Sequence, residues 1–131
     1  MINTESAFST IIDASITVKR TLGQGFLESV YQNALVRELQ LRGLEATAEV
    51  PLEVRYKGAV VGFFRADILV NRDIIIETKV AEAIAPAHEY QLVNYLKVSG
   101  IDYGIIINFG TNKVEFKRKF REYHNHNNNT Y

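Results

Sequence analysis

Residues 73–79 read Asp-Ile-Ile-Ile-Glu-Thr-Lys, and this stretch sets the expectation for the whole fold. Three consecutive isoleucines are typical of a strand buried on both faces, so we expect this strand to lie centrally in a sheet. Glu77 and Lys79 end the same strand, and residues two apart point to the same face. Because charges are costly where isoleucine is buried, this strand end raises the question of why an acid and a lysine lie there.

The sequence before this strand predicts two helices and a hairpin. Apolar residues recur at helical spacing over residues 5–21 and 26–42, and a glycine follows each segment. The period then changes to two over residues 46–56 and 59–70, which predicts two strands joined by a tight turn. Pro51 makes the first of these an edge strand or a bulged strand.

The sequence after this strand predicts a third helix and a further strand. Pro86 and Gly100 frame the helix at 86–99, and residues 103–109 are an apolar strand. Residues 113–121 carry five basic residues against one Glu and could form a last strand or a short helix. The order ααβββαβ predicts an α/β fold with a mixed sheet of about four strands flanked by helices.

We expect one domain over residues 1–121 and a disordered, Asn-rich tail at 122–131. The chain has 131 residues, 47% of them hydrophobic, which suits a single core. Its formal net charge of +0 means that any basic surface must be local. Without cysteine there are no disulfides or thiol nucleophiles, and without a signal sequence or a membrane span we expect a soluble cytoplasmic protein.

Two carboxylates are expected to meet at the end of the central strand. Asp67 lies on the strand at 59–70, and the short turn between the strands brings it close to Glu77. Mg²⁺ prefers oxygen ligands and is usually held by one or two carboxylates, and Lys79 beside it could hold the attacking water. Alternatively, both acids lie at solvated strand ends with Lys79 as their surface partner, a pair worth ~0 to 1 kcal/mol.

The helix at 86–99 mixes polar groups into its packing face. His88, Gln91, Leu92 and Tyr95 fall on one face at helical spacing. Gln91 and Tyr95 could orient a water, a phosphate or a carboxylate, or they could simply belong to the boundary and the core. His88 and Arg65 could touch phosphate, although solvated or core roles suit them equally. The basic run at 113–121 could likewise contact phosphate or form a solvated face.

Several segments together resemble a known family. Gly25-Phe-Leu-Glu28-Ser-Val-Tyr31 is similar to the signature of the GxxExxY protein family, a group of small bacterial and archaeal proteins in the PD-(D/E)xK nuclease superfamily. The resemblance runs from about Glu5 to Gly110, through GFLESVYQNAL, FRADILV, IIETK, HEYQLVNYLK and INFG. It implies a restriction-endonuclease-like core.

The resemblance also implies roles for individual residues. Asp67 matches the aspartate of the superfamily's second motif, and Glu77-Thr78-Lys79 matches its (D/E)xK tripeptide. Glu28 corresponds to the helical acid that often completes the metal site. Gln91 and Tyr95 fit the QxxxY motif of RecB-like nucleases. The implied metal ligands are Asp67, Glu77 and Glu28, and the implied cofactor is Mg²⁺ or Mn²⁺.

The implied activity is that of a divalent-metal-dependent nuclease that hydrolyses phosphodiester bonds. Its partner would be nucleic acid, with DNA favoured over RNA, and no membrane is implied. A homodimer is plausible because so small a domain would need a second copy to make paired cuts. The alternative is a binding or assembly module that uses a nuclease-like fold without turnover.

Overall fold

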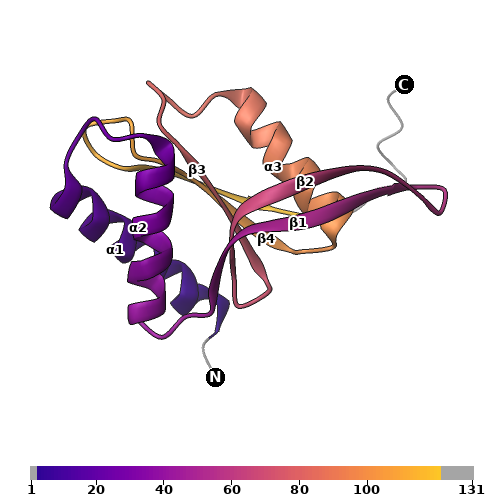
Figure 1. Cartoon of the computed structure of the whole chain (residues 1–131), viewed down its shortest axis with the longest axis horizontal. Coiled ribbons are helices and arrows are strands. Elements are labelled where there is room, and N and C mark those ends of the chain that lie inside the picture. Colours follow the sequence, from indigo (N-terminus) through magenta and orange to yellow (C-terminus); the bar gives the residue numbers. More distant parts are fainter. Residues whose placement is uncertain (1–2, 122–131) are drawn as a thin grey trace.

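The computed structural model describes residues 3–121, and the expected disordered tail at 122–131 lies outside them. Its elements follow in the order α1 (Thr4–Leu22), α2 (Glu28–Leu41), β1 (Ala46–Tyr56), β2 (Ala59–Val70), β3 (Ile74–Lys79), α3 (Pro86–Ser99), β4 (Tyr103–Asn108) and β5 (Glu115–Phe120) (Figure 1). The first seven match the predicted elements in type and order. The eighth resolves the choice left open for the basic segment, which is a strand.

The strands form one sheet in the order β1-β2-β3-β4-β5. Only β3 and β4 pair in parallel, and the other neighbours are antiparallel, so the sheet is mixed. β3 lies in the middle, as its isoleucines predicted. The sheet has five strands where about four were expected, because the basic segment forms β5 along the outer edge of β4. Its basic side chains are accommodated by acids: Arg118 pairs with Glu5 at 2.7 Å and Lys119 with Glu89 at 3.1 Å.

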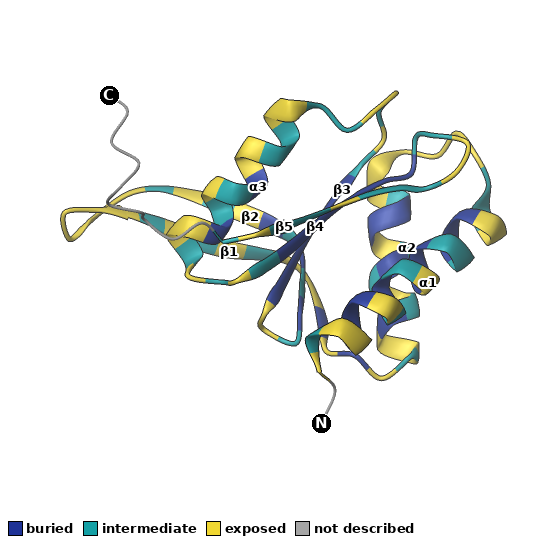
Figure 2. Cartoon of the chain, turned by 180° about the vertical axis from the view of Figure 1, so that it is seen from behind, coloured by how far each residue is buried: buried dark blue, intermediate teal, exposed yellow. Residues whose placement is uncertain are grey.

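The two faces of the sheet bury two separate sets of side chains. α1 and α2 lie together on one side and α3 lies on the other (Figure 2). Ile74 and Ile76 of β3 pack toward α1 and α2, whereas Ile75 packs with Leu92 and Leu96 of α3. Every one of these side chains is fully buried, and each contributes about 1.5–3 kcal/mol. Burial on both faces therefore explains the unbroken run of isoleucines.

Two hairpin turns set the register of β2. Lys57 and Gly58 both have positive φ, at 48° and 83°, and so do Asn71 and Arg72, at 50° and 62°. Two consecutive positive φ values give the turn geometry that matches the twist of paired strands. The first turn is the tight turn that the change of period predicted. β1 is an edge strand, which is where Pro51 is tolerated.

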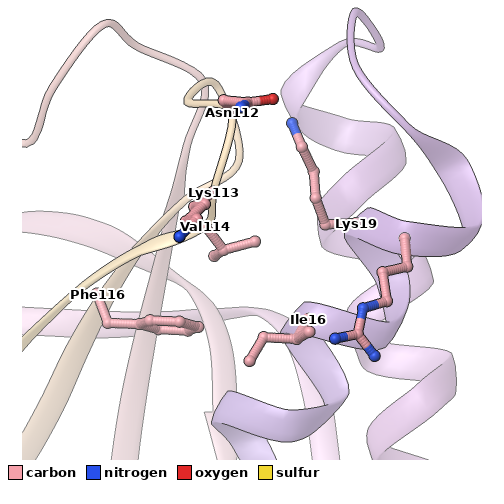
Figure 3. Close-up of a pocket in the computed structure, with 7 residues that line it drawn as sticks. Ile16, Lys19, Asn112, Lys113, Val114 and Phe116 are labelled. Carbon is pink, nitrogen blue, oxygen red and sulfur yellow. The ribbon is translucent and has the colours of Figure 1, made fainter.

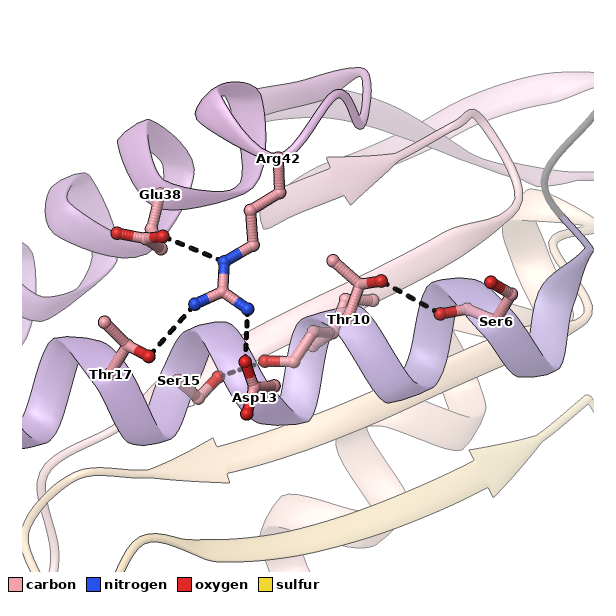
Figure 4. A network of polar contacts seen from close by, with 8 residues as sticks. Ser6, Thr10, Asp13, Ser15, Thr17, Glu38 and Arg42 are labelled. Atoms are coloured by element: carbon pink, nitrogen blue, oxygen red, sulfur yellow. Dashed lines mark hydrogen bonds and ion pairs between the residues drawn. The ribbon is translucent and has the colours of Figure 1, made fainter.

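Arg42, which follows α2, joins α2 to α1 (Figure 4). Its guanidinium donates to Asp13 at 2.5 Å and to Thr17 at 3.0 Å on α1, and to Glu38 at 2.8 Å on its own helix. The planar guanidinium suits several acceptors at once. This contact fixes the helix pair, and with it the position of α2 beside the sheet.

Candidate active site

Asp67 and Glu77 meet where β2 and β3 separate. The ladder between these strands pairs Ile68 with Ile76. One step further on, the Asp67 N–H donates to Oε2 of Glu77 at 3.1 Å, and the Thr78 N–H donates to Oδ2 of Asp67 at 2.8 Å. Each carboxylate thus accepts a hydrogen bond from a backbone N–H of the other strand, which a backbone carbonyl would accept in a regular β-ladder. The structure brings the two acids together, as the hairpin register predicted.

The backbone at Asp67 is also held from α2 and is irregular toward β1. Its carbonyl accepts a hydrogen bond from Nε2 of Gln32 at 3.2 Å. On β1, Glu49 has a φ of 52° and lies between the residues that pair with Ile68 and Ala66. Positive φ is uncommon for a residue other than glycine, and such positions often lie near functional sites. Sequence reasoning does not identify Gln32, because its burial depends on how α2 packs on the sheet.

The environment of the pair strongly disfavours two negative charges. Glu77 is 5% exposed. Burial, followed by the charge of Asp67, raises the pKa of Glu77 from 4.5 to about 8. Two adjacent carboxylates in a dry site cannot both ionise without cost. Near neutral pH, the pair therefore retains a proton or needs a cation beside it.

Lys79 lies on the same face as Glu77, at the end of β3. Its charge opposes the upward pKa shifts of both Glu77 and Glu28, so its ammonium acts on both carboxylates. Within residues 3–121, however, no carboxylate oxygen is within 4.0 Å of it. The main-chain carbonyl of Lys79 accepts from the Phe109 N–H at 2.8 Å, which fixes the strand end against β4. The ammonium is therefore close to the acids without being committed to a direct ion pair.

Glu28 is the first residue of α2, and the loop before it is tightly organised. Gly25 has a φ of 102°, which glycine adopts without strain. The Tyr31 hydroxyl donates to the Gly23 carbonyl at 2.5 Å, and its fully buried ring stacks on Phe109 at 4.9 Å. Gly25 and Tyr31 therefore have structural roles that place Glu28.

Glu28 lies near the carboxylate pair without joining it. Partial burial, followed by the charge of Asp67, raises the pKa of Glu28. Even so, no three or more His, Asp or Glu side chains in the described part of the chain are grouped closely enough to hold a metal ion by themselves. The structure thus brings Asp67 and Glu77 together and leaves Glu28 outside the pair.

From α3, Tyr95 faces the pair and Gln91 is exposed. Burial raises the pKa of Tyr95, and the charges of Glu77 and Asp67 add to this, so its hydroxyl lies near both acids. Its ring stacks on Phe64 of β2 with centroids 3.8 Å apart, a contact that no sequence pattern indicated. His88 accepts the Ala85 N–H at 3.0 Å and so starts the helix.

Comparison of the chain with known protein families identifies the superfamily to which it belongs. The chain matches the model of the PD-(D/E)XK nuclease superfamily over residues 5–119, and it belongs to that superfamily. Among solved structures it is similar to the crystal structure of SSO0001, with a TM-score of 0.57 and 18% identity. The match covers 92% of this chain and 61% of that chain, and at this identity it shows the fold alone. No curated protein matches the chain.

PD-(D/E)XK nucleases generally use divalent metal ions, and the carboxylate pair fits such an ion. Backbone donors occupy one oxygen of each acid, Oδ2 of Asp67 and Oε2 of Glu77, and the second oxygen of each could ligate a cation. Carboxylate oxygens are the donors that Mg²⁺ and Mn²⁺ prefer, and one or two commonly suffice.

None of the helices in residues 3–121 combines the length and apolar character that crossing a membrane requires.

Proposed function

We propose that this protein is a divalent-metal-dependent nuclease that hydrolyses phosphodiester bonds of nucleic acid. The observation that carries the proposal is the buried pair of Asp67 and Glu77, which has an uncommitted Lys79 ammonium on the same side of the sheet. Perturbed carboxylates with a specific charged neighbour are typical of active sites. Membership of a nuclease superfamily supports the same reading.

In this proposal each site residue has its own role in the hydrolysis of one phosphodiester bond. The hydroxyl of a water adds to phosphorus, the phosphorus–oxygen bond breaks, and the leaving oxygen takes up a proton. Asp67 and Glu77, with Glu28 approaching from α2, would hold Mg²⁺ or Mn²⁺. The bound ion would supply positive charge to the phosphate and lower the pKa of the attacking water.

The remaining residues would position the reactants. Lys79 would donate a hydrogen bond to the attacking water or to a phosphate oxygen, where its charge stabilises the negative charge that develops. Tyr95, whose pKa is raised in part by the charges of both acids, would orient a carboxylate or the water. Gln91 is exposed one turn earlier on α3 and would contact the substrate.

Several finer features belong to the same proposal. The order of motifs supports placing the chain in the GxxExxY family within the superfamily. Within the proposal, Mg²⁺ is the ion and DNA is the substrate. We also propose one domain over residues 1–121, a cytoplasmic location and a homodimer when paired cuts are made.

Metal binding without substrate is the first test of the site. Mn²⁺ is titrated by calorimetry into the wild type, into Asp67→Asn, and into Glu82→Gln, which changes an exposed acid just beyond β3. We expect binding to the wild type and to Glu82→Gln, and its loss in Asp67→Asn. Equal binding to all three proteins would exclude the pair as the metal site.

A cleavage screen over single- and double-stranded DNA and RNA then tests catalysis. We expect Lys79→Ala to lower the rate by about 10²-fold or more, because removing one preorganised charge at the reacting phosphate has effects of this size. Lys97→Ala, an exposed lysine on α3, is the matched control and should keep the wild-type rate. Full cleavage by Lys79→Ala would remove its assigned role.

A non-catalytic nucleic-acid-binding module is the second candidate. One observation favours it: within residues 3–121 the acids do not form a cluster of three, and Glu28 stays outside the pair. Nucleic-acid binding that is unaffected by chelators and by Asp67→Asn, together with no cleavage in the screen, would favour this candidate over the nuclease.

A further inference from the structure

A second site candidate is the cavity between α1 and the segment that enters β5. Its volume is about 370 Å³, within the ~300–1,000 Å³ range of small-molecule sites. Its lining comprises Ile16, Lys19, Arg20, Asn112, Lys113, Val114 and Phe116 (Figure 3). None of these residues belongs to the carboxylate site.

The cavity carries three cations that no acid of the described chain neutralises. Lys19, Arg20 and Lys113 have no carboxylate within 4.0 Å among residues 3–121. Nearby β5 is different, because Arg118 and Lys119 are both paired with acids. In a chain whose formal net charge is +0, this is a local concentration of unpaired positive charge. Such a concentration attracts anions.

Lys19 is an unusual member of this set because it is 9% exposed. Its ammonium donates to the Phe109 carbonyl and to Oε1 of Gln24, each at 2.5 Å, and both acceptors are neutral. An ammonium has three protons, so these two bonds leave one that is not hydrogen-bonded, and the nearby Tyr31 ring, whose centroid is 5.5 Å from the ammonium, carries no net charge. A buried charge without a counter-ion is costly, and an anionic ligand would supply the missing charge.

The rest of the lining is apolar and aromatic. Phe116 and Ile16 point toward one another from opposite walls, and Lys19 reaches toward Asn112 at the rim (Figure 3). A free phosphate would use only the cations. A nucleotide would use both parts of the cavity: its phosphate would meet the cations, its base would lie against the apolar wall, and the Asn112 amide could bond to a base edge.

The cavity is connected to the candidate active site through the backbone of Phe109, the residue that follows β4. Lys19 bonds to the carbonyl of Phe109, and the N–H of Phe109 bonds to the carbonyl of Lys79. Gln24 bridges Lys19 to the Gly110 carbonyl at 2.8 Å and lies in the loop that leads to Glu28. A ligand in the cavity would therefore lie across β4 from the carboxylate pair.

We infer that this cavity is a nucleotide-binding subsite that holds one phosphate and its base. The inference stands on the cavity and its charges and does not require catalysis. The nucleotide could belong to a nucleic-acid strand that continues past the active site, or it could be a free mononucleotide. Only this choice of source depends on the proposed function.

The test is a nuclear magnetic resonance titration of the full-length, ¹⁵N-labelled chain in EDTA. The probes are deoxyadenosine 5′-monophosphate, inorganic phosphate and deoxyadenosine. We expect the mononucleotide to shift the amides of Ile16, Arg20 and Phe116, and to bind about ten-fold or more tightly than either fragment. Fragments that bind as tightly as the mononucleotide, or no mononucleotide binding, would overturn the inference.

Three charge reversals and one active-site variant sharpen the test. Arg20→Glu and Lys113→Glu change exposed cations of the cavity, and Arg37→Glu makes the same change on α2, outside the cavity. We expect the first two to weaken mononucleotide binding about ten-fold and the third to leave it nearly unchanged. Equal losses in all three would show non-specific attraction and would refute the subsite.

Asp67→Asn separates this inference from the proposed nuclease, because it removes a metal ligand and should leave mononucleotide binding intact. Loss of binding in Asp67→Asn would place the mononucleotide at the carboxylate pair and contradict the subsite. A short single-stranded oligonucleotide identifies the source. The same shifts and the same sensitivity to Lys113→Glu would support a strand, whereas binding of the mononucleotide alone would support a free nucleotide.

Discussion

Replacing Glu77 by glutamine should stabilise the metal-free protein, and increasingly so as the pH rises. The native state holds the Glu77 proton more tightly than the unfolded chain does, because burial and Asp67 raise its pKa from 4.5 to about 8. Protonation therefore favours the native state. The stabilisation is complete below pH 4.5 and is lost progressively as the pH rises toward 8. A glutamine at the same position has no proton to lose and can still accept the Asp67 N–H.

The size of the effect follows from the same pKa values. Each pH unit between the unfolded and the native pKa corresponds to about 1.4 kcal/mol. Relative to pH values below 4.5, the protein therefore loses about 3 kcal/mol of unfolding free energy at pH 7, because the unfolded chain releases the Glu77 proton while the native state keeps it, and ~5 kcal/mol above pH 8. Since domains are stable by only ~5–15 kcal/mol, the change is large enough to measure.

The pH dependence of the unfolding free energy is measured by urea denaturation, followed by circular dichroism, in EDTA at pH 5.5, 6.5, 7.5 and 8.5. The difference in unfolding free energy between Glu77→Gln and wild type should grow by about 1.4 kcal/mol per pH unit between the first three points. Glu82→Gln, at an exposed position, should show a difference that does not change with pH. A flat difference for Glu77→Gln as well would refute the argument that Glu77 is protonated in the metal-free protein.

Four further outcomes follow from the packing and the site. Mn²⁺ should raise the wild-type melting temperature more at pH 8 than at pH 6, because a bound cation needs ionised carboxylates. Gly110→Ala places a Cβ 2.5 Å from backbone atoms of the segment after β3, so it should lower the free energy of unfolding, measured in urea, by ~1–3 kcal/mol or more. Gly62→Ala is its control, because a Cβ there meets nothing within 4 Å. Arg42→Ala should lower the free energy of unfolding in urea by about 1–3 kcal/mol. Arg72→Ala, at an exposed position, should lower it by under ~0.5 kcal/mol. Tyr31→Phe should cost about 1 kcal/mol and weaken Mn²⁺ binding by calorimetry, since its hydroxyl fixes the loop before α2.

The fold could be predicted because its decisive signals are local. Three consecutive isoleucines with no polar residue between them specify a strand buried on both faces, and Pro86 and Gly100 frame a helix with few alternatives. β5 was ambiguous for a physical reason. Its basic residues are unfavourable in a core, and only the distant acids Glu5 and Glu89 make them compatible with a sheet edge.

The carboxylate pair was predictable for the same reason, and its surroundings were not. Asp67 and Glu77 are ten residues apart and joined by a short hairpin, so their proximity follows from register alone. Gln32 reaches Asp67 across 35 residues and Lys19 reaches Phe109 across 90. Such contacts depend on how α1 and α2 pack on the sheet, and no periodicity in the sequence encodes that packing.

The geometry also differs from the solvated reading of the charged strand end. A solvated pair would leave both acids exposed and put Lys79 in contact with them, with little effect on stability. Instead Glu77 is 5% exposed, and within residues 3–121 Lys79 has no carboxylate within 4.0 Å, so its charge offsets only part of the cost of ionising Glu77. A buried acid pair that costs about 3 kcal/mol at pH 7 is hard to explain by folding. We therefore expect the balancing positive charge to come from a cation bound during function.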